Sequence, residues 1–348
     1  MMVWYVFSRK IDNFGDVAIS LRLSQQLSTQ MNCQIILFTE FNDTLKKLIP
    51  SLSINSKTFH IERLVIRDID QDFDMINHPT HIINVFNISI PNSYFSKISN
   101  STRYIIYEYL SAEKWVESFH LKPSVTKHKY LKKIFFFPGF TKKTGGLLIE
   151  QKDNQKVKKS LDFFHKKDNS IVSYSFSIFA YAHTGIDNFL NVIDNLNVSV
   201  NLYVPEIMLR NKKVSTDKSS NLIIYPFLSF DDFDRLLANC DINFVRGEDS
   251  LVRAIYSGKP FIWQPYVQEK NTHLDKLNAF IDLYFSGLRE PLFTIISVAF
   301  NEWAFGRLSL SSLNDFIENI DELQKYYLDQ SLANISQKSV INNLIEHC

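Results

Sequence analysis

Short apolar runs rich in β-branched and aromatic residues alternate with longer amphipathic stretches along the first part of the chain. The runs predict strands at 3–8, 34–39, 63–66, 81–88, 103–107 and 133–137, and an amphipathic stretch at 17–29 predicts a helix. The strands are continuously apolar rather than strictly alternating, which is typical of a parallel sheet covered on both faces. This pattern predicts one α/β domain.

The pattern breaks at residues 141–159, where a Thr-Gly-Gly sequence is followed by a charged run, and resumes at residue 171. Further strands are predicted at 171–176, 198–204, 221–227, 242–246 and 260–263, with helices at about 187–196, 231–238, 250–257 and 273–285. The sequence after Pro291 is mostly helical in pattern, including 312–328 and 331–346.

We therefore expect an α/β protein with two Rossmann-like domains, residues 1–150 and 151–330. The last helix, about 331–348, is a segment that can pack back on the first domain. Two doubly wound domains in series predict a cleft between them, where ligands bind beyond the carboxyl ends of the strands.

Composition supports two domains and narrows the class of protein. At about 150 residues per domain, 348 residues suit two domains. The 38 basic and 37 acidic groups nearly cancel, so the chain lacks the basic excess expected of a nucleic-acid binder. Only 9 glycines leave few places for a glycine-rich phosphate loop.

The cysteines and the amino terminus indicate where the protein works. Cys33, Cys240 and Cys348 form no ligand cluster, which favours a reducing compartment and argues against a zinc site. The first seven residues lack the basic region of a signal peptide, and no apolar stretch approaches the roughly 18 residues of a membrane helix. We expect a cytoplasmic protein with no membrane partner.

The first candidate for chemistry lies between the first predicted strand and helix. Asp12, Gly15 and Asp16 follow the carboxyl end of the strand, where α/β sheets hold ligands. Gly15 permits a tight turn and a close approach by a ligand. Alternatively, Asp12 bonds a turn amide and Asp16 is an ordinary helix N-cap.

The second candidate follows the predicted strand 242–246. Backbone amides at the start of the next helix and the guanidinium of Arg246 make a natural pocket for a diphosphate. Glu248 and Asp249 would repel that anion, so bonding sugar hydroxyls or holding the loop amides suits them better. Alternatively, both acids only offset the helix macrodipole.

Aromatic side chains follow several strands of the second predicted domain. Phe179, Tyr181 and Phe227 are placed to sandwich a planar base, although aromatic residues this frequent also serve as core. Tyr266 can donate to a phosphate oxygen, or can pack on its own domain. We expect His273 to be a helix cap or a surface residue.

Several longer motifs occur in order along both predicted domains. They are 11–16, Tyr109-Leu110-Ser111-Ala112-Glu113, 136–140 followed by Thr144-Gly145-Gly146, 241–250, Gly258-Lys259-Pro260-Phe261 with Trp263, and Tyr266 with Gln268 and His273-Leu274. In these motifs the chain resembles the EarP family, the arginine rhamnosyltransferases that mature bacterial elongation factor P. The resemblance runs from the first strand to about residue 285, and the string 243–250 is its most specific part.

The resemblance implies a GT-B glycosyltransferase with two facing Rossmann-like domains and an interdomain cleft. It implies a nucleotide sugar, dTDP-β-L-rhamnose, in the C-terminal domain and elongation factor P as the protein acceptor against the N-terminal domain. The implied reaction inverts the anomeric centre and gives an α-rhamnosyl arginine, with no cofactor beyond the substrates.

Roles for individual residues follow from the same resemblance. Asp16 takes the place of the general base, with Asp12 beside it. The donor-binding positions hold the diphosphate and ribose, surround the thymine or lie close to the donor. They are Arg246, Glu248, Asp249, Ser250, Tyr266, Phe179, Tyr181, Phe227 and Gly15. Near Phe179 the alignment has an alternative, because Tyr174 and Phe176 show the same spacing.

One position departs from the family pattern. The glutamine that usually follows Phe227 is replaced by Phe230, which removes a side-chain donor and acceptor from a contact with the base. No Asp-x-Asp metal pair is evident at the donor site, so we expect no metal, although Glu248 and Asp249 keep that alternative open.

Physical chemistry independently supports carboxylates as catalytic groups. An arginine side chain has a pKa above about 12, so its nitrogens are poor nucleophiles while charged. Carboxylates can orient the guanidinium and accept its proton as the new bond forms.

Two alternative functions remain. One is a GT-B enzyme with another donor sugar or acceptor, and the other is a nucleotide-sugar-binding protein without turnover.

Overall fold

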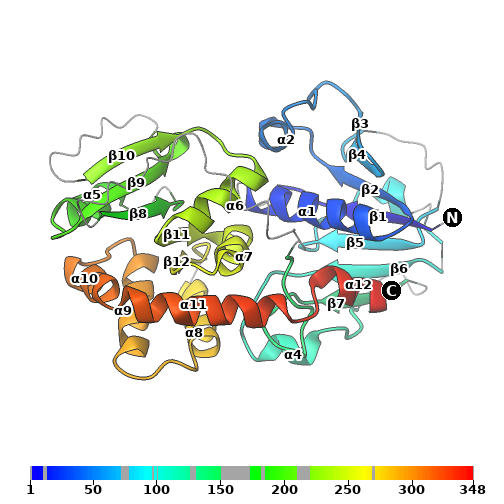
Figure 1. Cartoon of the computed structure of the whole chain (residues 1–348). Coiled ribbons are helices and arrows are strands. Elements are labelled where there is room, and N and C mark those ends of the chain that lie inside the picture. The colour runs from blue at the N-terminus through cyan, green and yellow to red at the C-terminus, as the bar shows by residue number, and fades with distance from the viewer. Residues whose placement is uncertain are drawn as a thin grey trace. The chain divides into compact units, whose positions relative to one another are not determined.

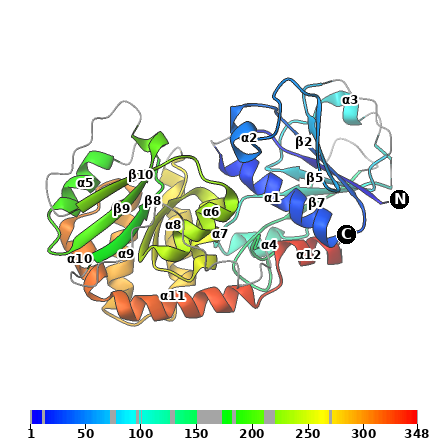
Figure 2. The ribbon, with the colours of Figure 1, turned by 45° about the horizontal axis from the view of Figure 1, so that its top comes forward.

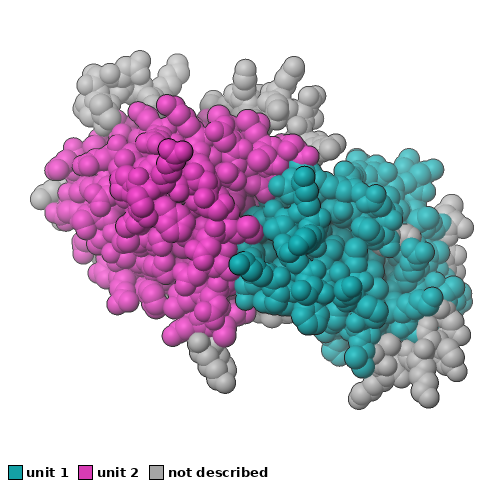
Figure 3. Space-filling model, turned by 90° about the horizontal axis from the view of Figure 1, so that it is seen from below, with its two compact units in different colours: residues 1–150, 337–348 teal, residues 151–336 magenta. Residues whose placement is uncertain are grey.

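The computed structural model describes residues 2–10, 14–71, 78–95, 98–99, 101–125, 131–149, 173–181, 185–209, 220–268 and 271–347. The chain divides into two compact units (Figure 3). Unit 1 comprises residues 1–150 and 337–348, and unit 2 comprises residues 151–336. No helix of the described segments is long and apolar enough to cross a membrane.

Unit 1 is built on a sheet with the strand order β3-β4-β2-β1-β5-β6-β7 (Figure 1). The strands are β1 Val3–Phe7, β2 Gln34–Thr39, β3 Thr58–Ile61, β4 Leu64–Asp68, β5 His81–Val85, β6 Arg103–Tyr107 and β7 Lys132–Phe136. From β4 to β7 all neighbouring strands pair in parallel. Every residue of the central β1 is buried, as the continuous apolar run predicted.

The edge strand β3 is the exception in this sheet. It pairs with β4 in antiparallel fashion, and Glu62 in the connecting turn has a φ of 50°. The sequence pattern predicted no strand at 58–61, so this antiparallel edge strand was missed. The reason is that β3 has only four residues and none of them is fully buried, so it carries no apolar run to detect.

The helices of unit 1 are α1 Gly15–Gln30, α2 Asp43–Leu48, α3 Asn92–Phe95, α4 Trp115–Phe119 and α12 Val340–His347. α1 packs against the sheet through Leu21, Leu23 and Leu27, which are at most 1% exposed. α12 is joined to unit 1 because the backbone N–H of Val340 donates to the Leu147 carbonyl at 3.1 Å. Nδ2 of Asn343 also donates to the Gly145 carbonyl at 2.9 Å.

Unit 2 contains a wholly parallel sheet with the order β10-β9-β8-β11-β12. Figure 2 shows β8, β9 and β10 side by side. The strands are β8 Ser173–Ile178, β9 Ser199–Pro205, β10 Ser220–Tyr225, β11 Ile242–Arg246 and β12 Phe261–Gln264. Phe176 of β8 and Phe244 of β11 are fully buried, so the carboxyl ends of these two central strands are fixed side by side.

The helices of unit 2 are α5 Ile186–Asp194, α6 Phe230–Asn239, α7 Gly247–Ser257, α8 Thr272–Tyr284, α9 Leu292–Ala304, α10 Leu310–Glu318 and α11 Ile320–Ile335, with a short 3-10 helix at Glu206–Met208. α11 is held to the sheet by Tyr327, whose hydroxyl donates to the Phe261 carbonyl at 2.6 Å. On the same helix, Nε2 of Gln324 donates to the Gly258 carbonyl at 2.7 Å.

The predicted helices at 312–328 and 331–346 are wrong in their boundaries. Asn319 ends α10 and precedes α11, and residues 336–339 separate α11 from α12. The buried residues do not reveal the first break, since Phe316 of α10 and Leu323 of α11 are seven positions apart. That interval is about two turns of a continuous helix, so the apolar pattern runs through Asn319 without a change.

Candidate active site

Asp16 is the second residue of α1, the helix that follows β1 along the chain, and is 5% exposed. Ser20 Oγ lies 2.6 Å from Ser8 Oγ and 2.7 Å from the Asp16 carbonyl oxygen, so the first turn of α1 is tied to the end of the strand. The N-cap of α1 is Phe14, and the alternative that Asp16 is a helix N-cap is therefore wrong. Asp12 lies outside the described residues.

Gly15 is the first residue of α1, and a Cβ built on it meets no atom within 4 Å. Its φ is not positive, so the backbone conformation at this position does not by itself require glycine. The close approach of a ligand to the backbone at this point stays a prediction.

Replacing Gly15 with alanine is expected to leave the free energy of unfolding unchanged or to raise it by up to about 1 kcal/mol, because alanine suits a helix better than glycine. Turnover should fall if the added methyl group meets a substrate. Gly146→Ala is the contrasting variant, since Gly146 has a φ of 79° and its Cβ would collide with the Lys338 carbonyl. Chemical denaturation and initial rates measure both effects, and unchanged turnover of Gly15→Ala would remove Gly15 from the site.

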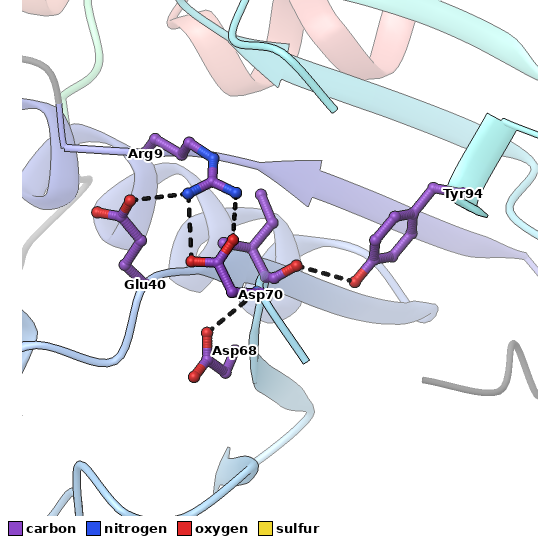
Figure 4. A network of polar contacts seen from close by, with 6 residues as sticks. Arg9, Glu40, Asp68, Asp70 and Tyr94 are labelled. Atoms are coloured by element: carbon purple, nitrogen blue, oxygen red, sulfur yellow. Dashed lines mark hydrogen bonds and ion pairs between the residues drawn. The ribbon is translucent and has the colours of Figure 1, made fainter. Parts of the chain in front are cut away.

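An ion-pair network that the sequence did not predict lies at the carboxyl edge of the same sheet (Figure 4). Arg9, just beyond β1, donates to Glu40 beyond β2 at 2.9 Å and also pairs with Asp70 beyond β4. The hydrogen bond to Asp70 raises the pKa of the guanidinium above its ordinary value. The network joins the ends of three strands next to the segment that leads to α1.

In unit 2, Arg246 is the last residue of β11 and the N-cap of α7. Ser250 Oγ accepts a hydrogen bond from the Arg246 backbone N–H at 3.1 Å and also contacts the Arg246 carbonyl oxygen. Gly247 has a φ of 63°, and its carbonyl accepts the indole N–H of Trp263 at 2.7 Å. Ser250 is only 4% exposed, so its hydroxyl serves this turn first.

Glu248, in the first turn of α7, forms an ion pair with Lys276 of α8. Lys276 Nζ lies 2.6 Å from Glu248 Oε1, and the two side chains are 19% and 12% exposed. Glu248 therefore fastens the start of α7 to α8. Lys276 was not predicted, because nothing in the sequence indicates that α8 packs beside this turn.

Lys276→Met is expected to lower the free energy of unfolding by about 1–3 kcal/mol, because it leaves a largely buried carboxylate without its ammonium partner. The matched control is Lys143→Met. Lys143 pairs with Glu117 at 3.3 Å but is 77% exposed, so its loss should cost about 0–1 kcal/mol. Denaturant unfolding compares the two variants, and equal losses would contradict the structural weight given to the Lys276 pair.

Aromatic side chains gather around Arg246. Its Cζ lies 4.4 Å from the ring centroid of Phe179 and 4.6 Å from that of Tyr181. The ring of Tyr181 is 5.6 Å from that of Tyr266, which is 51% exposed. The alternative assignment to Phe176 fails geometrically, because Phe176 is fully buried in the sheet.

Phe227 and Phe230 follow β10, which is an edge strand of the sheet of unit 2. Phe227, 43% exposed, follows β10, which is separated from β8 by β9. Phe230 begins α6, whose N-cap Ser229 accepts the Asp232 N–H at 3.2 Å. Farther along the same helix, Phe233 packs edge-on against the Phe179 ring, so α6 contacts the aromatic group around Arg246.

His273 differs from its prediction as a cap or surface residue. It is 4% exposed, and its Nδ1 accepts the Gln268 backbone N–H at 3.3 Å. Burial lowers the pKa of His273, so the neutral ring is favoured. The histidine therefore fixes the loop that carries Tyr266 to the start of α8.

Asp16 thus belongs to unit 1, whereas Arg246 and the side chains grouped around it belong to unit 2. Asp249 lies half-buried in the first turn of α7, beside Glu248. Among the residues that the structure describes, no three His, Cys, Asp or Glu side chains gather as metal ligands do.

The family model and the relatives that match this chain both describe rhamnosyltransferases. Residues 4–348 match the family "Elongation-Factor P (EF-P) rhamnosyltransferase EarP". A protein-arginine rhamnosyltransferase of Pseudomonas putida is 32% identical over 312 residues, which are 82% of each chain.

Solved structures give the same fold. A chain from work on EarP-mediated arginine glycosylation of translation elongation factor EF-P superposes with a TM-score of 0.65 at 20% identity, covering 99% of this chain and 98% of that chain. A calicheamicin glycosyltransferase gives a TM-score of 0.54 at 8% identity over the same shares. The two parallel-sheet domains therefore have the GT-B fold that the sequence predicted.

Proposed function

Because this chain belongs to the EarP family of elongation factor P rhamnosyltransferases, we propose that it transfers L-rhamnose from dTDP-β-L-rhamnose to an arginine of elongation factor P. The observation that carries the proposal within the structure is the cluster around Arg246. It places a guanidinium, a helix start and two aromatic side chains together at the carboxyl ends of β8 and β11.

This cluster suits a nucleoside diphosphate. The guanidinium of Arg246 and the amides at the start of α7 can bind phosphate oxygens, and the exposed Tyr266 hydroxyl can donate a further hydrogen bond. Asp249 can accept a hydrogen bond from a sugar hydroxyl, while Glu248 holds the turn through Lys276. The aromatic side chains Phe179, Tyr181 and Phe227 supply apolar surface for the thymine.

The chemical step needs a nucleophile, a base and a stabilised leaving group. A guanidinium nitrogen of the acceptor attacks the anomeric carbon from the face opposite the diphosphate, and the bond from that carbon to the diphosphate oxygen breaks. The attacking nitrogen passes its proton to the Asp16 carboxylate, with Asp12 beside it. dTDP leaves with its charge stabilised by Arg246 and neighbouring donors, without a metal.

Acceptor-dependent release of dTDP tests this proposal. Release is expected from dTDP-β-L-rhamnose when elongation factor P is present, to be undiminished by EDTA, and to be far slower with UDP-glucose. Strong preference for UDP-glucose would show that dTDP-β-L-rhamnose is not the donor. Loss of activity in EDTA would show that the chemical step needs a metal. Binding of dTDP-rhamnose without any release would favour a binding protein. We place the reaction in the cytoplasm, where a translation factor is available.

A further inference from the structure

The guanidinium of Arg246 lies over two aromatic rings that sequence reasoning would assign to the nucleobase. Its Cζ is 4.4 Å from the Phe179 centroid and 4.6 Å from the Tyr181 centroid. Both distances are within the range of about 6 Å at which a cation is attracted to the face of an aromatic ring. Two such contacts on one guanidinium restrict where its planar fork can point.

The rings are themselves fixed by the sheet. The Phe179 backbone N–H donates to the Phe244 carbonyl at 2.8 Å, which continues the pairing of β8 with β11. The Tyr181 backbone N–H donates to Oε1 of the fully buried Gln264 at 3.3 Å. Tyr181 is only 5% exposed, so its ring cannot turn away freely to follow a ligand.

The backbone of Arg246 is fixed as well. Ser250 Oγ accepts its N–H and contacts its carbonyl oxygen, and the side chain then emerges at the start of α7. An arginine side chain free in solvent would have to be ordered when it binds an anion, which lowers affinity. Here the backbone and the two rings hold the side chain in place before the anion arrives.

We propose that Phe179 and Tyr181 are positioning residues for Arg246. By holding the guanidinium at the carboxyl end of β11, they raise the affinity for the diphosphate of the donor rather than only for its base. This inference rests on the proposed function, because it takes Arg246 to bind the diphosphate. It assigns to the two rings a contribution that depends on the arginine beside them.

A double-mutant cycle between Tyr181→Leu and Arg246→Met tests this inference, with dTDP binding measured by calorimetry. In the presence of Arg246, Tyr181→Leu is expected to weaken dTDP binding about 2- to 30-fold, the range of one cation–π contact. In the Arg246→Met background the same change should have little further effect. Phe179→Leu should behave in the same way and serves if Tyr181→Leu does not fold.

Tyr181→Phe is the matched control, because it keeps the ring and should retain most of the affinity. Thymidine, which lacks phosphates, should lose less affinity than dTDP on Tyr181→Leu. Equal losses in both arginine backgrounds, or equal losses for thymidine and dTDP, would show that the rings serve the base alone and would overturn the inference. If Arg246→Met by itself left dTDP binding unchanged, the diphosphate assignment in the proposed function would be the part that fails.

Discussion

Asp16→Asn is expected to abolish rhamnosyl transfer while leaving the donor bound. Asparagine has nearly the same shape but cannot accept the guanidinium proton, so turnover should fall by about 10²- to 10⁴-fold, the usual contribution of a general base. Asp16 is 5% exposed at the second residue of α1 and belongs to unit 1, whereas Arg246 and the side chains grouped around it belong to unit 2. Single-turnover rates and calorimetric titration with dTDP separate the two effects.

Asp43→Asn is the control for this prediction. Asp43 is also an aspartate in the first turn of a helix of unit 1, but it is exposed. The control should therefore keep its turnover. A folded Asp16→Asn protein with the turnover of the unchanged enzyme would show that another group accepts the proton.

Arg246→Met should have the largest effect on donor binding. A hydrogen bond to a charged group contributes about 1.5–3 kcal/mol, so the Kd for dTDP is expected to rise about 10- to 150-fold. Methionine keeps much of the length of the side chain and its packing on Phe179, so the loss reports the charge. Calorimetric titration with dTDP measures the change.

Arg235→Met controls for the removal of an arginine from unit 2. Arg235 lies on α6, and it pairs with Asp232 on the same helix. Its replacement should leave dTDP affinity close to that of the unchanged protein. An Arg246→Met protein that bound dTDP as tightly as Arg235→Met would place the diphosphate elsewhere.

The parts of the fold that could be predicted are those whose burial leaves a strong pattern. The apolar run of β1 and the Leu21, Leu23 and Leu27 spacing of α1 gave a strand and a helix at the right places. β3 was missed because it is a short, half-buried edge strand. The break at Asn319 was missed because the buried residues of the two flanking helices keep the spacing of one continuous helix.

In the candidate site, some residues could be predicted from the sequence, but their contacts with one another could not. Arg246, Phe179 and Tyr181 could be proposed from the sequence because each follows a strand, and parallel strands bring their carboxyl ends to one edge. Their contact with one another depends on the register of β8 against β11, which the sequence pattern does not encode.

Partners supplied by distant elements were not predictable. Lys276 reaches Glu248 from α8, and Arg9 joins Glu40 and Asp70 from three strand ends. Nothing local marks such residues as partners, since each is an ordinary charged residue in its own segment. Only the folded structure shows which of these charged residues form ion pairs with one another.

The most direct test of the account is the intact mass of elongation factor P after incubation with the enzyme and dTDP-β-L-rhamnose, followed by fragmentation to locate the change. We predict the addition of one deoxyhexose to one arginine, and no addition when Asp16→Asn replaces the unchanged enzyme. No added mass, or a sugar attached to a residue other than arginine, would contradict the account.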